Sequence, residues 1–231
     1  MGPYAKEEHL ACVIARLLDG SRHAAIGASS PIPASGCFLK KMYDPGFRVS
    51  LQQRRAANPF TEGSRELFDL AGQGRIDTFF LGGAQIDGTA AINLVRAEGK
   101  RFPGSFGSAF MYPMVPGTIL FREEHSRRTL VPKVEFVSAR GSPKALVTGK
   151  ALFSWQKDKR RFRLESIHEQ FDVRAETGFD FDAPTDVPLT PPPSDEELRL
   201  LRGPVAKLVT ADYPDFAKRV WNASLNGRGI N

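Results

Sequence analysis

The chain has 231 residues, of which 41% are hydrophobic and 25% charged, a composition typical of a soluble globular protein. No apolar run approaches the ~20 residues that span a membrane, and no basic-then-apolar leader pattern opens the chain, so we expect a cytoplasmic protein. The formal net charge is +6, but the basic residues are dispersed and no nucleic-acid-binding signature accompanies them, so we expect no nucleic-acid partner. The cysteines and histidines lack CxxC or zinc-ligand spacing, so no metal site is expected.

Hydrophobic periodicity and turn residues predict helices alternating with strands. The helices are expected at Lys6–Leu18, Pro33–Met42, Ser64–Gln73 and from Ser194 onward, the last with a capping box formed by Ser194 and Glu197. The strands are expected at Ala24–Ile26, Phe47–Leu51, Thr78–Leu81, Ala91–Val95, Thr118–Arg122 and Val134–Ser138, with a hairpin of Lys150–Trp155 and Phe162–Ile167. This alternation predicts an α/β fold with an open, mostly parallel sheet flanked by helices. We expect one domain over residues 1–222 and a flexible tail over 223–231.

The most informative segment is the loop that follows the strand Thr78–Leu81. It reads Gly82-Gly-Ala-Gln-Ile-Asp87. Glycines at a strand end let the backbone approach a ligand closely, and ligands of open α/β sheets bind beyond the carboxyl ends of the strands. The segment therefore predicts a site for an anionic or acyl ligand, although a tight turn between buried strands is the alternative.

A second glycine turn, Pro103-Gly-Ser-Phe-Gly-Ser108, could line the same site. Neither loop matches a Walker A or a GxGxxG pattern, which argues against nucleotide triphosphates and dinucleotides. Ser29 and Ser30 are not framed by GxSxG, so a hydrolytic triad is not indicated. The basic run Lys157–Arg163 is interpreted as a solvated hairpin tip, with cofactor-phosphate binding as the alternative.

Several motifs, in order, resemble one family. Phe80-Leu-Gly-Gly-Ala-Gln-Ile-Asp87 resembles a glycine–glutamine–aspartate segment, and Pro103–Gly107 resembles a PGSGG turn. Further matches are the Ile26–Pro33 loop, Lys133–Ser138, Leu146–Phe153, Phe162–Leu164 and Glu176–Phe179. Together they resemble the B (β) subunit of the class I CoA-transferases, closest to the glutaconate CoA-transferase type, and are also similar to the small subunit of the cholesterol ring-opening CoA hydrolase. The resemblance implies a CoA-transferase-like (NagB/RpiA-like) fold.

The resemblance also implies a function. It implies an enzyme that acts on an acyl-CoA thioester, has coenzyme A as a (co)substrate with no permanently bound cofactor, and needs an α subunit to complete its active site. The implied pocket residues are Gly82, Gly83, Ala84, Gln85, Asp87, Asn93, Gly104, Ser105, Phe106 and Gly107. Backbone amides of the glycine loops would stabilise a thioester oxyanion, while Gln85 and Asp87 would orient the acyl group.

The sequence departs from the family pattern at three places. Gln52 stands where the family has a nucleophilic glutamate, and an amide has no carboxylate oxygen to attack the thioester. Ala90 and Ala91 replace the first pair of a Gly-Asn-x-Asn segment, of which Asn93 remains, and Phe106 replaces a glycine of the turn. The departures leave three interpretations open: a transferase whose partner brings the carboxylate, an acyl-CoA hydrolase or ring-cleaving subunit, and a non-catalytic CoA-binding subunit.

Overall fold

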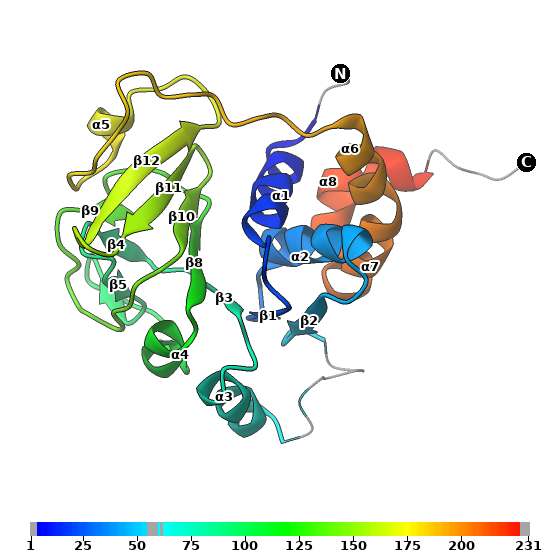
Figure 1. Cartoon of the computed structure of the whole chain (residues 1–231), viewed down its shortest axis with the longest axis horizontal. Coiled ribbons are helices and arrows are strands. Elements are labelled where there is room, and N and C mark those ends of the chain that lie inside the picture. Colours follow the sequence, from blue (N-terminus) through cyan, green and yellow to red (C-terminus); the bar gives the residue numbers. More distant parts are fainter. Residues whose placement is uncertain (1–3, 55–59, 61, 227–231) are drawn as a thin grey trace, which may run out of the picture. The chain divides into compact units, whose positions relative to one another are not determined.

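The computed structural model describes residues 4–54, 60 and 62–226, which form two compact units (Figure 1). Unit 1 takes both ends of the chain, residues 1–61 and 192–231, and unit 2 is Glu62–Pro191. The single domain predicted over residues 1–222 stays a prediction. The flexible tail predicted over residues 223–231 also stays a prediction: the last helix continues to Asn226, and residues 227–231 lie outside the described part.

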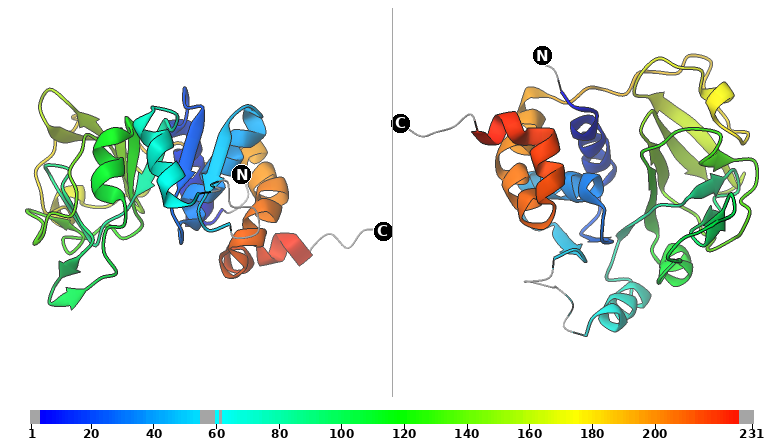
Figure 2. Two further views of the ribbon diagram at one scale, coloured as in Figure 1. Left: turned by 90° about the horizontal axis from the view of Figure 1, so that it is seen from below. Right: turned by 180° about the vertical axis from the view of Figure 1, so that it is seen from behind.

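Unit 1 packs helices from the two ends of the chain together. Its elements are α1 (Lys6–Leu17), β1 (His23–Ile26), α2 (Pro31–Tyr43), β2 (Arg48–Leu51), α6 (Asp195–Leu200), the π-helical turn η1 (Leu201–Val205), α7 (Ala206–Asp212) and α8 (Pro214–Asn226). In Figure 2 the blue N-terminal helices lie beside the orange and red C-terminal ones. Strands β1 and β2 are parallel, with Ile26 opposite Leu51, so their carboxyl ends lie at one edge.

Close packing and buried charge hold unit 1 together. Helices α1 and α2 touch at Gly36, where an added Cβ would lie 2.6 Å from Ile14 Cγ2. The C-terminal helices are tied to α1 by the buried Glu8 carboxylate, which accepts hydrogen bonds from Arg202 at 2.7 and 2.9 Å and from Trp221 at 3.2 Å. The predicted capping box is confirmed, since Ser194 Oγ accepts from Glu197 N at 3.1 Å and Glu197 Oε2 from Ser194 N at 2.7 Å.

The main sheet of unit 2 has its strands in the order β12-β11-β10-β8-β3. They are β3 (Thr78–Leu81), β8 (Gly117–Arg122), β10 (Ala145–Thr148), β11 (Ala151–Gln156) and β12 (Arg161–Ile167). The first three are parallel, whereas β11 and β12 form the predicted antiparallel hairpin at the sheet edge. Alternate residues of the hairpin point inward, and Phe153 and Phe162 are fully buried. The α/β fold class predicted from sequence is confirmed.

Smaller elements complete unit 2. These are α3 (Ser64–Gly72), α4 (Ser108–Met114), α5 (Val173–Glu176), a three-stranded sheet of β5 (Ile92–Asn93), β4 (Gln85–Asp87) and β9 (Leu130–Val131), and a ribbon of β6 (Arg96–Ala97) and β7 (Lys100–Arg101). The strand predicted at Ala91–Val95 shrinks to β5, because Asn93 Oδ1 accepts from Val95 N and turns the chain.

The strand predicted at Val134–Ser138 is wrong. Two of its backbone donors bind side chains of β4 instead of a neighbouring strand: Val134 N donates to Asp87 Oδ2 at 3.2 Å and Glu135 N to Gln85 Oε1 at 3.1 Å. The segment therefore lies over β4 as an irregular chain, and a pattern of apolar residues could not reveal that its partners are side chains.

Candidate functional site

Strand β3 is buried over its whole length and runs straight into Gly82 and Gly83. A Cβ added to Gly83 would lie 2.8 Å from the backbone oxygen of Gln85. Ala84 N donates to Asn93 O at 2.8 Å, which starts the small sheet. Glycine is therefore required at position 83 by the tight passage from β3 to β4, before any ligand is considered.

The predicted side chains Gln85 and Asn93 meet in a buried polar network. Gln85 Oε1 accepts from Asn93 Nδ2 at 2.9 Å, and Gln85 Nε2 donates to Glu135 Oε1 at 2.8 Å. Asn93 Nδ2 also donates to Arg96 O at 2.6 Å. Both amides are buried, so these hydrogen bonds replace the water that each group loses.

Asp87 is the anchor of the same network. Its Oδ1 accepts from Thr89 N at 2.9 Å, Thr89 Oγ1 at 2.6 Å and Ala91 N at 3.3 Å, while Oδ2 accepts from Val134 N. A buried carboxylate is stable only when it is paired or hydrogen-bonded in this way. Asp87 thus fixes two separate loops, the Thr89–Ala91 turn and the segment that begins at Val134. A direct role for Gln85 and Asp87 on an acyl group stays a prediction.

The second glycine turn lies in different surroundings. Gly104 has φ +112° and Phe106 has φ +46°; Ser108, at the start of α4, donates through N and Oγ to Ser105 O at 2.9 and 2.5 Å. The Phe106 side chain is 73% exposed. Its ring lies 5.8 Å from that of Phe68, which also contacts Phe110 at 5.6 Å.

Phe106, just before α4, and Phe110 and Met114, within it, are large exposed apolar side chains that we call the α4 patch. Large apolar side chains gathered on a surface mark an interaction site more often than scattered ones do. The sequence offered one signal for it, the Phe within a glycine turn.

Ala90 and Phe106, which replace glycines of the family pattern, share one backbone feature. Ala90 has φ +60° and Phe106 has φ +46°, both in the left-handed region that glycine adopts without strain. The backbone thus keeps a glycine-type conformation at both positions. Tyr112 of α4 donates its hydroxyl to Ala90 O at 3.0 Å; burial and then the Asp87 charge raise the pKa of this hydroxyl, so it stays a donor. This hydrogen bond therefore connects the Thr89–Ala91 turn to α4, the helix that follows the second glycine turn.

The remaining predicted site residue, Gln52, lies in unit 1 and directly follows β2. It is half-buried, and its backbone N donates to Ile26 O of the neighbouring strand at 3.0 Å. Arg54 Nη2 forms an ion pair with Asp212 Oδ2 at 2.7 Å, and its guanidinium lies 5.7 Å from the centre of the Phe38 ring. A guanidinium held on both sides is neither a nucleophile nor a base.

The loop after β1 contacts the C-terminal end of α7, where Asp212 also lies. Ser30 N donates to the hydroxyl of Tyr213 at 3.4 Å, and burial raises the pKa of Tyr213 to about 12. Asp212 and Tyr213 were not singled out from the sequence, because they lie 158 and 183 residues from their partners Arg54 and Ser30 and form no motif with them. Ser29 in this loop has φ +57°.

Cys12, Cys37 and His125 are buried side chains with structural surroundings. Burial raises the pKa of the Cys12 thiol to about 12, with a smaller effect of Glu197, and burial also raises that of Cys37. His125 lies between Thr148 Oγ1 at 2.8 Å and Thr177 Oγ1 at 3.0 Å. Among the residues that the structure describes, no group of His, Cys, Asp or Glu could hold a metal ion, and no helix is long and apolar enough to cross a membrane.

Comparison with solved structures identifies the fold. The decarboxylase AibA/AibB matches with a TM-score of 0.74 and 20% identity over 94% of this chain and 99% of that chain. IpdAB from Rhodococcus jostii RHA1 matches with a TM-score of 0.74 and 21% identity, over 87% of this chain and 94% of that chain. Glutaconate coenzyme A-transferase from Acidaminococcus fermentans matches with a TM-score of 0.74 and 18% identity over the same shares, 87% and 94%.

No family model matches the sequence, and no curated protein matches it. The chain therefore has the fold of a CoA-transferase subunit, and the resemblance seen in its motifs is confirmed at the level of the fold. The three-dimensional match runs over nearly the whole of the compared chains.

Proposed function

We propose that this chain is the β-type subunit of a two-part CoA-transferase-family enzyme, acting on an acyl-CoA thioester without forming a glutamyl-CoA adduct on this chain. The observation that carries the proposal is Gln52 at the end of β2, in a chain with the fold of glutaconate coenzyme A-transferase. The family's nucleophile belongs at this position, and a glutamine side chain offers no carboxylate.

Heteromeric assembly is part of this proposal. Two of the proteins with the same fold carry names with two components, AibA/AibB and IpdAB. The exposed α4 patch is a surface of the kind that a partner subunit covers. The α subunit would then contribute the catalytic carboxylate that this chain lacks.

The glycine loops would polarise the substrate carbonyl. Backbone N–H groups of Gly82 and Gly83 would stabilise the oxyanion that develops at the thioester, the usual effect of preorganised donors. Gln85, Asp87 and Asn93 would act as positioning residues, because their side chains hold the surrounding loops by hydrogen bonds. The second glycine turn, from Gly104 to Gly107, would close the pocket from the α4 side.

The adduct test addresses the proposal directly. The chain, co-purified with its natural α partner, is incubated with a panel of short-chain and dicarboxylic acyl-CoA thioesters, treated with borohydride, and measured by intact mass. We expect no adduct on this chain. A reduced glutamyl adduct here would contradict the proposal and restore the ordinary ping-pong mechanism.

A gain-of-function variant sharpens the same experiment. Gln52→Glu introduces a carboxylate at the family position with almost unchanged volume, and we expect it to make this chain trappable. Gln53→Glu is the matched control and should stay free of adduct, because it lies one residue further from Leu51, the last residue of β2, than the family position does. Equal trapping of both variants would show that Gln52 does not occupy the nucleophile position.

Cleavage of a carbon–carbon bond is the second candidate. It is favoured by the shared fold with a protein described as a decarboxylase, together with the missing carboxylate. Release of carbon dioxide or of a shortened acyl-CoA would identify cleavage, whereas release of free CoA into water without an acceptor acid would identify hydrolysis. CoA binding without any turnover would identify a non-catalytic subunit.

A further inference from the structure

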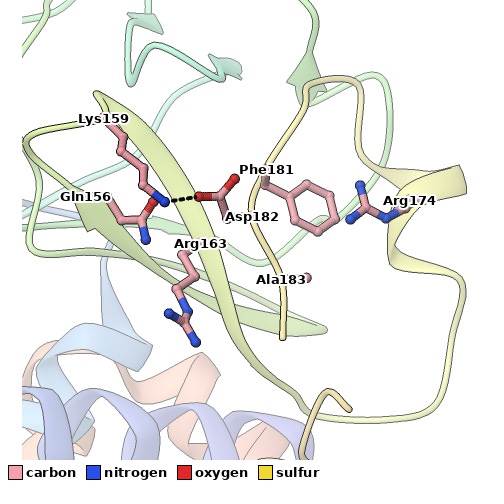
Figure 3. Close-up of a pocket in the computed structure, with 7 residues that line it drawn as sticks. All are labelled: Gln156, Lys159, Arg163, Arg174, Phe181, Asp182 and Ala183. Atoms are coloured by element: carbon pink, nitrogen blue, oxygen red, sulfur yellow. Dashed lines mark hydrogen bonds and ion pairs between the residues drawn. The ribbon is translucent and has the colours of Figure 1, made fainter. Parts of the chain in front are cut away.

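Unit 2 contains a pocket to which the proposed reaction at the thioester assigns no role. Its volume is about 520 Å³, and it is lined by Gln156, Lys159, Arg163, Arg174, Phe181, Asp182 and Ala183 (Figure 3). Pockets for small-molecule ligands span about 300–1,000 Å³, so this one could enclose a molecule of nucleotide or sugar-phosphate size.

The pocket lies at the opposite edge of the sheet from the Gly82 loop. Gln156 ends β11, which runs antiparallel to β10, and β10 is parallel to β8 and β3. The end of β11 therefore lies at the amino ends of the parallel strands, whereas Gly82 follows the carboxyl end of β3. A ligand here would be held apart from the predicted glycine-loop site within unit 2.

The lining of the pocket is positively charged, with three cations against one carboxylate. That carboxylate, Asp182, is already paired, since Lys159 Nζ lies 2.9 Å from its Oδ2 and Arg161 Nε lies 3.4 Å from its Oδ1. The Lys159 hydrogen bond lowers the pKa of Asp182, so the pair persists at neutral pH. The excess positive charge therefore rests on Arg163 and Arg174.

Both arginines can offer N–H donors to a ligand. The guanidinium of Arg174 lies 4.8 Å from the centre of the Phe181 ring, a cation–π contact that orients the group without consuming its N–H bonds. Arg163 Nε lies 3.7 Å from Glu165 Oε1, and both side chains are more than one-third exposed. Such a pair contributes little and can be exchanged for a stronger oxyanion contact.

The amide of Gln156 adds a second kind of contact. Its Oε1 is buried and has no hydrogen-bond partner within the described part of the chain. A buried acceptor without a donor costs free energy, and if the amide turns toward the pocket, a ligand that brings an O–H or N–H group would remove that cost. The pocket thus combines donors for an anion with an acceptor for a neighbouring hydroxyl or amine.

We propose that this pocket binds a small molecule that carries a phosphate group beside a hydroxyl or amino group. Arg163 and Arg174 lie apart in the lining (Figure 3), so each would bind its own phosphate oxygens, for which planar guanidinium groups are well suited, and a ligand with two phosphate groups can engage both. Gln156 would accept from the adjacent hydroxyl or amino group. Two sources share this chemistry: the phosphorylated ribose of CoA itself, and a separate nucleotide or sugar phosphate that acts as an effector.

Calorimetric titration of the full chain tests the proposal without any need for turnover. The ligands are adenosine 3′,5′-bisphosphate, inorganic phosphate and adenosine. We expect the bisphosphate to bind, and the double variant Arg163→Gln/Arg174→Gln to weaken it about tenfold to a hundredfold. Lys157→Gln, on the same hairpin turn but outside the lining, is the matched control and should bind like the wild type. Failure of both phosphate ligands to bind, or binding that survives the double variant, overturns the proposal.

Two further arms complete the test. Gln156→Leu should weaken the bisphosphate more than inorganic phosphate, since only the former brings a ribose hydroxyl beside the phosphate; an equal loss of both would refute the role of the amide. Titration with CoA and dephospho-CoA separates the sources. If the double variant removes the preference for CoA over dephospho-CoA, the pocket binds the CoA ribose phosphate; if the preference persists while bisphosphate binding is lost, the ligand is a separate effector.

Discussion

The two glycine loops of unit 2 look alike in sequence and differ in almost everything that folding adds. The loop at Gly82 and Gly83 runs into a strand whose polar side chains are buried and hydrogen-bonded. The turn at Gly104–Gly107 carries a residue with positive φ, Phe106, and presents that residue's ring to the surface. Glycine spacing thus identifies where the backbone turns tightly, and only the surroundings tell whether the turn is a rigid scaffold or an accessible surface.

The largest effect is expected for Asp87→Ala in the rigid loop. The substitution leaves the N–H groups of Thr89, Ala91 and Val134 without their acceptor in the interior, which should cost roughly 3 kcal/mol or more of the free energy of unfolding. Urea denaturation measures it. Asp87→Asn keeps one acceptor oxygen and should lose clearly less. Wild-type stability of the alanine variant would mean that the network does not hold this loop.

The next largest effect is expected for a glycine substitution, and its cost in stability should differ between the two loops. A Cβ at Gly83 would collide with backbone, Gln85 O at 2.8 Å, whereas one at Gly107 would meet only the ring of the half-buried Phe68, at 2.2 Å. Backbone cannot yield cheaply, so Gly83→Ala should cost about 1–3 kcal/mol, or several degrees in the unfolding midpoint. Gly107→Ala should cost less, because the ring can turn toward solvent. The reverse order in thermal unfolding would contradict the comparison.

The α4 patch should matter more for association than for folding. Phe110→Ser should cost the isolated chain only about 1 kcal/mol of stability, since the ring is 41% exposed and only its remaining surface packs, partly on Phe68. It should weaken binding to the α subunit about tenfold, the effect of removing one well-placed aromatic contact. Titration of the purified partner measures the affinity, with Leu189→Ser, another exposed apolar position of unit 2, as control. Equal affinities for wild type and Phe110→Ser would exclude the patch from the interface.

The smallest effect on stability is expected at Phe106, whose backbone keeps a glycine-type conformation. Phe106→Gly relieves a left-handed conformation that costs other residues about 1–2 kcal/mol, but it also adds freedom to the unfolded chain, worth about 0.4–1 kcal/mol. The net change should be a slight stabilisation. Phe106→Ala keeps the strain and removes the ring, so it should show no gain. If the glycine variant unfolds more easily than the alanine variant, the φ of +46° is not a source of strain.

The sequence by itself determined the elements and the fold class, because these depend on local patterns. Apolar spacing placed α1, the prolines at the start of α2 and the Ser194 capping box marked helix ends, and alternation defined the β11–β12 hairpin. The order of short motifs was sufficient to indicate a CoA-transferase-like fold, which the solved structures share at 18–21% identity.

Tertiary structure alone decided which polar residues are free to act. Gln85, Asp87 and Asn93 look like ligand contacts in sequence, yet in the structure they have partners of their own. Gln85 and Asn93 bind each other, and Gln85 and Asp87 bind a segment up to 50 residues away. The Val134–Ser138 segment has the pattern of a strand but lies on side chains of β4. Asp212, Tyr213 and the lining of the basic pocket come from segments with no shared motif. Such contacts arise from chain folding over long separations, which no local periodicity encodes.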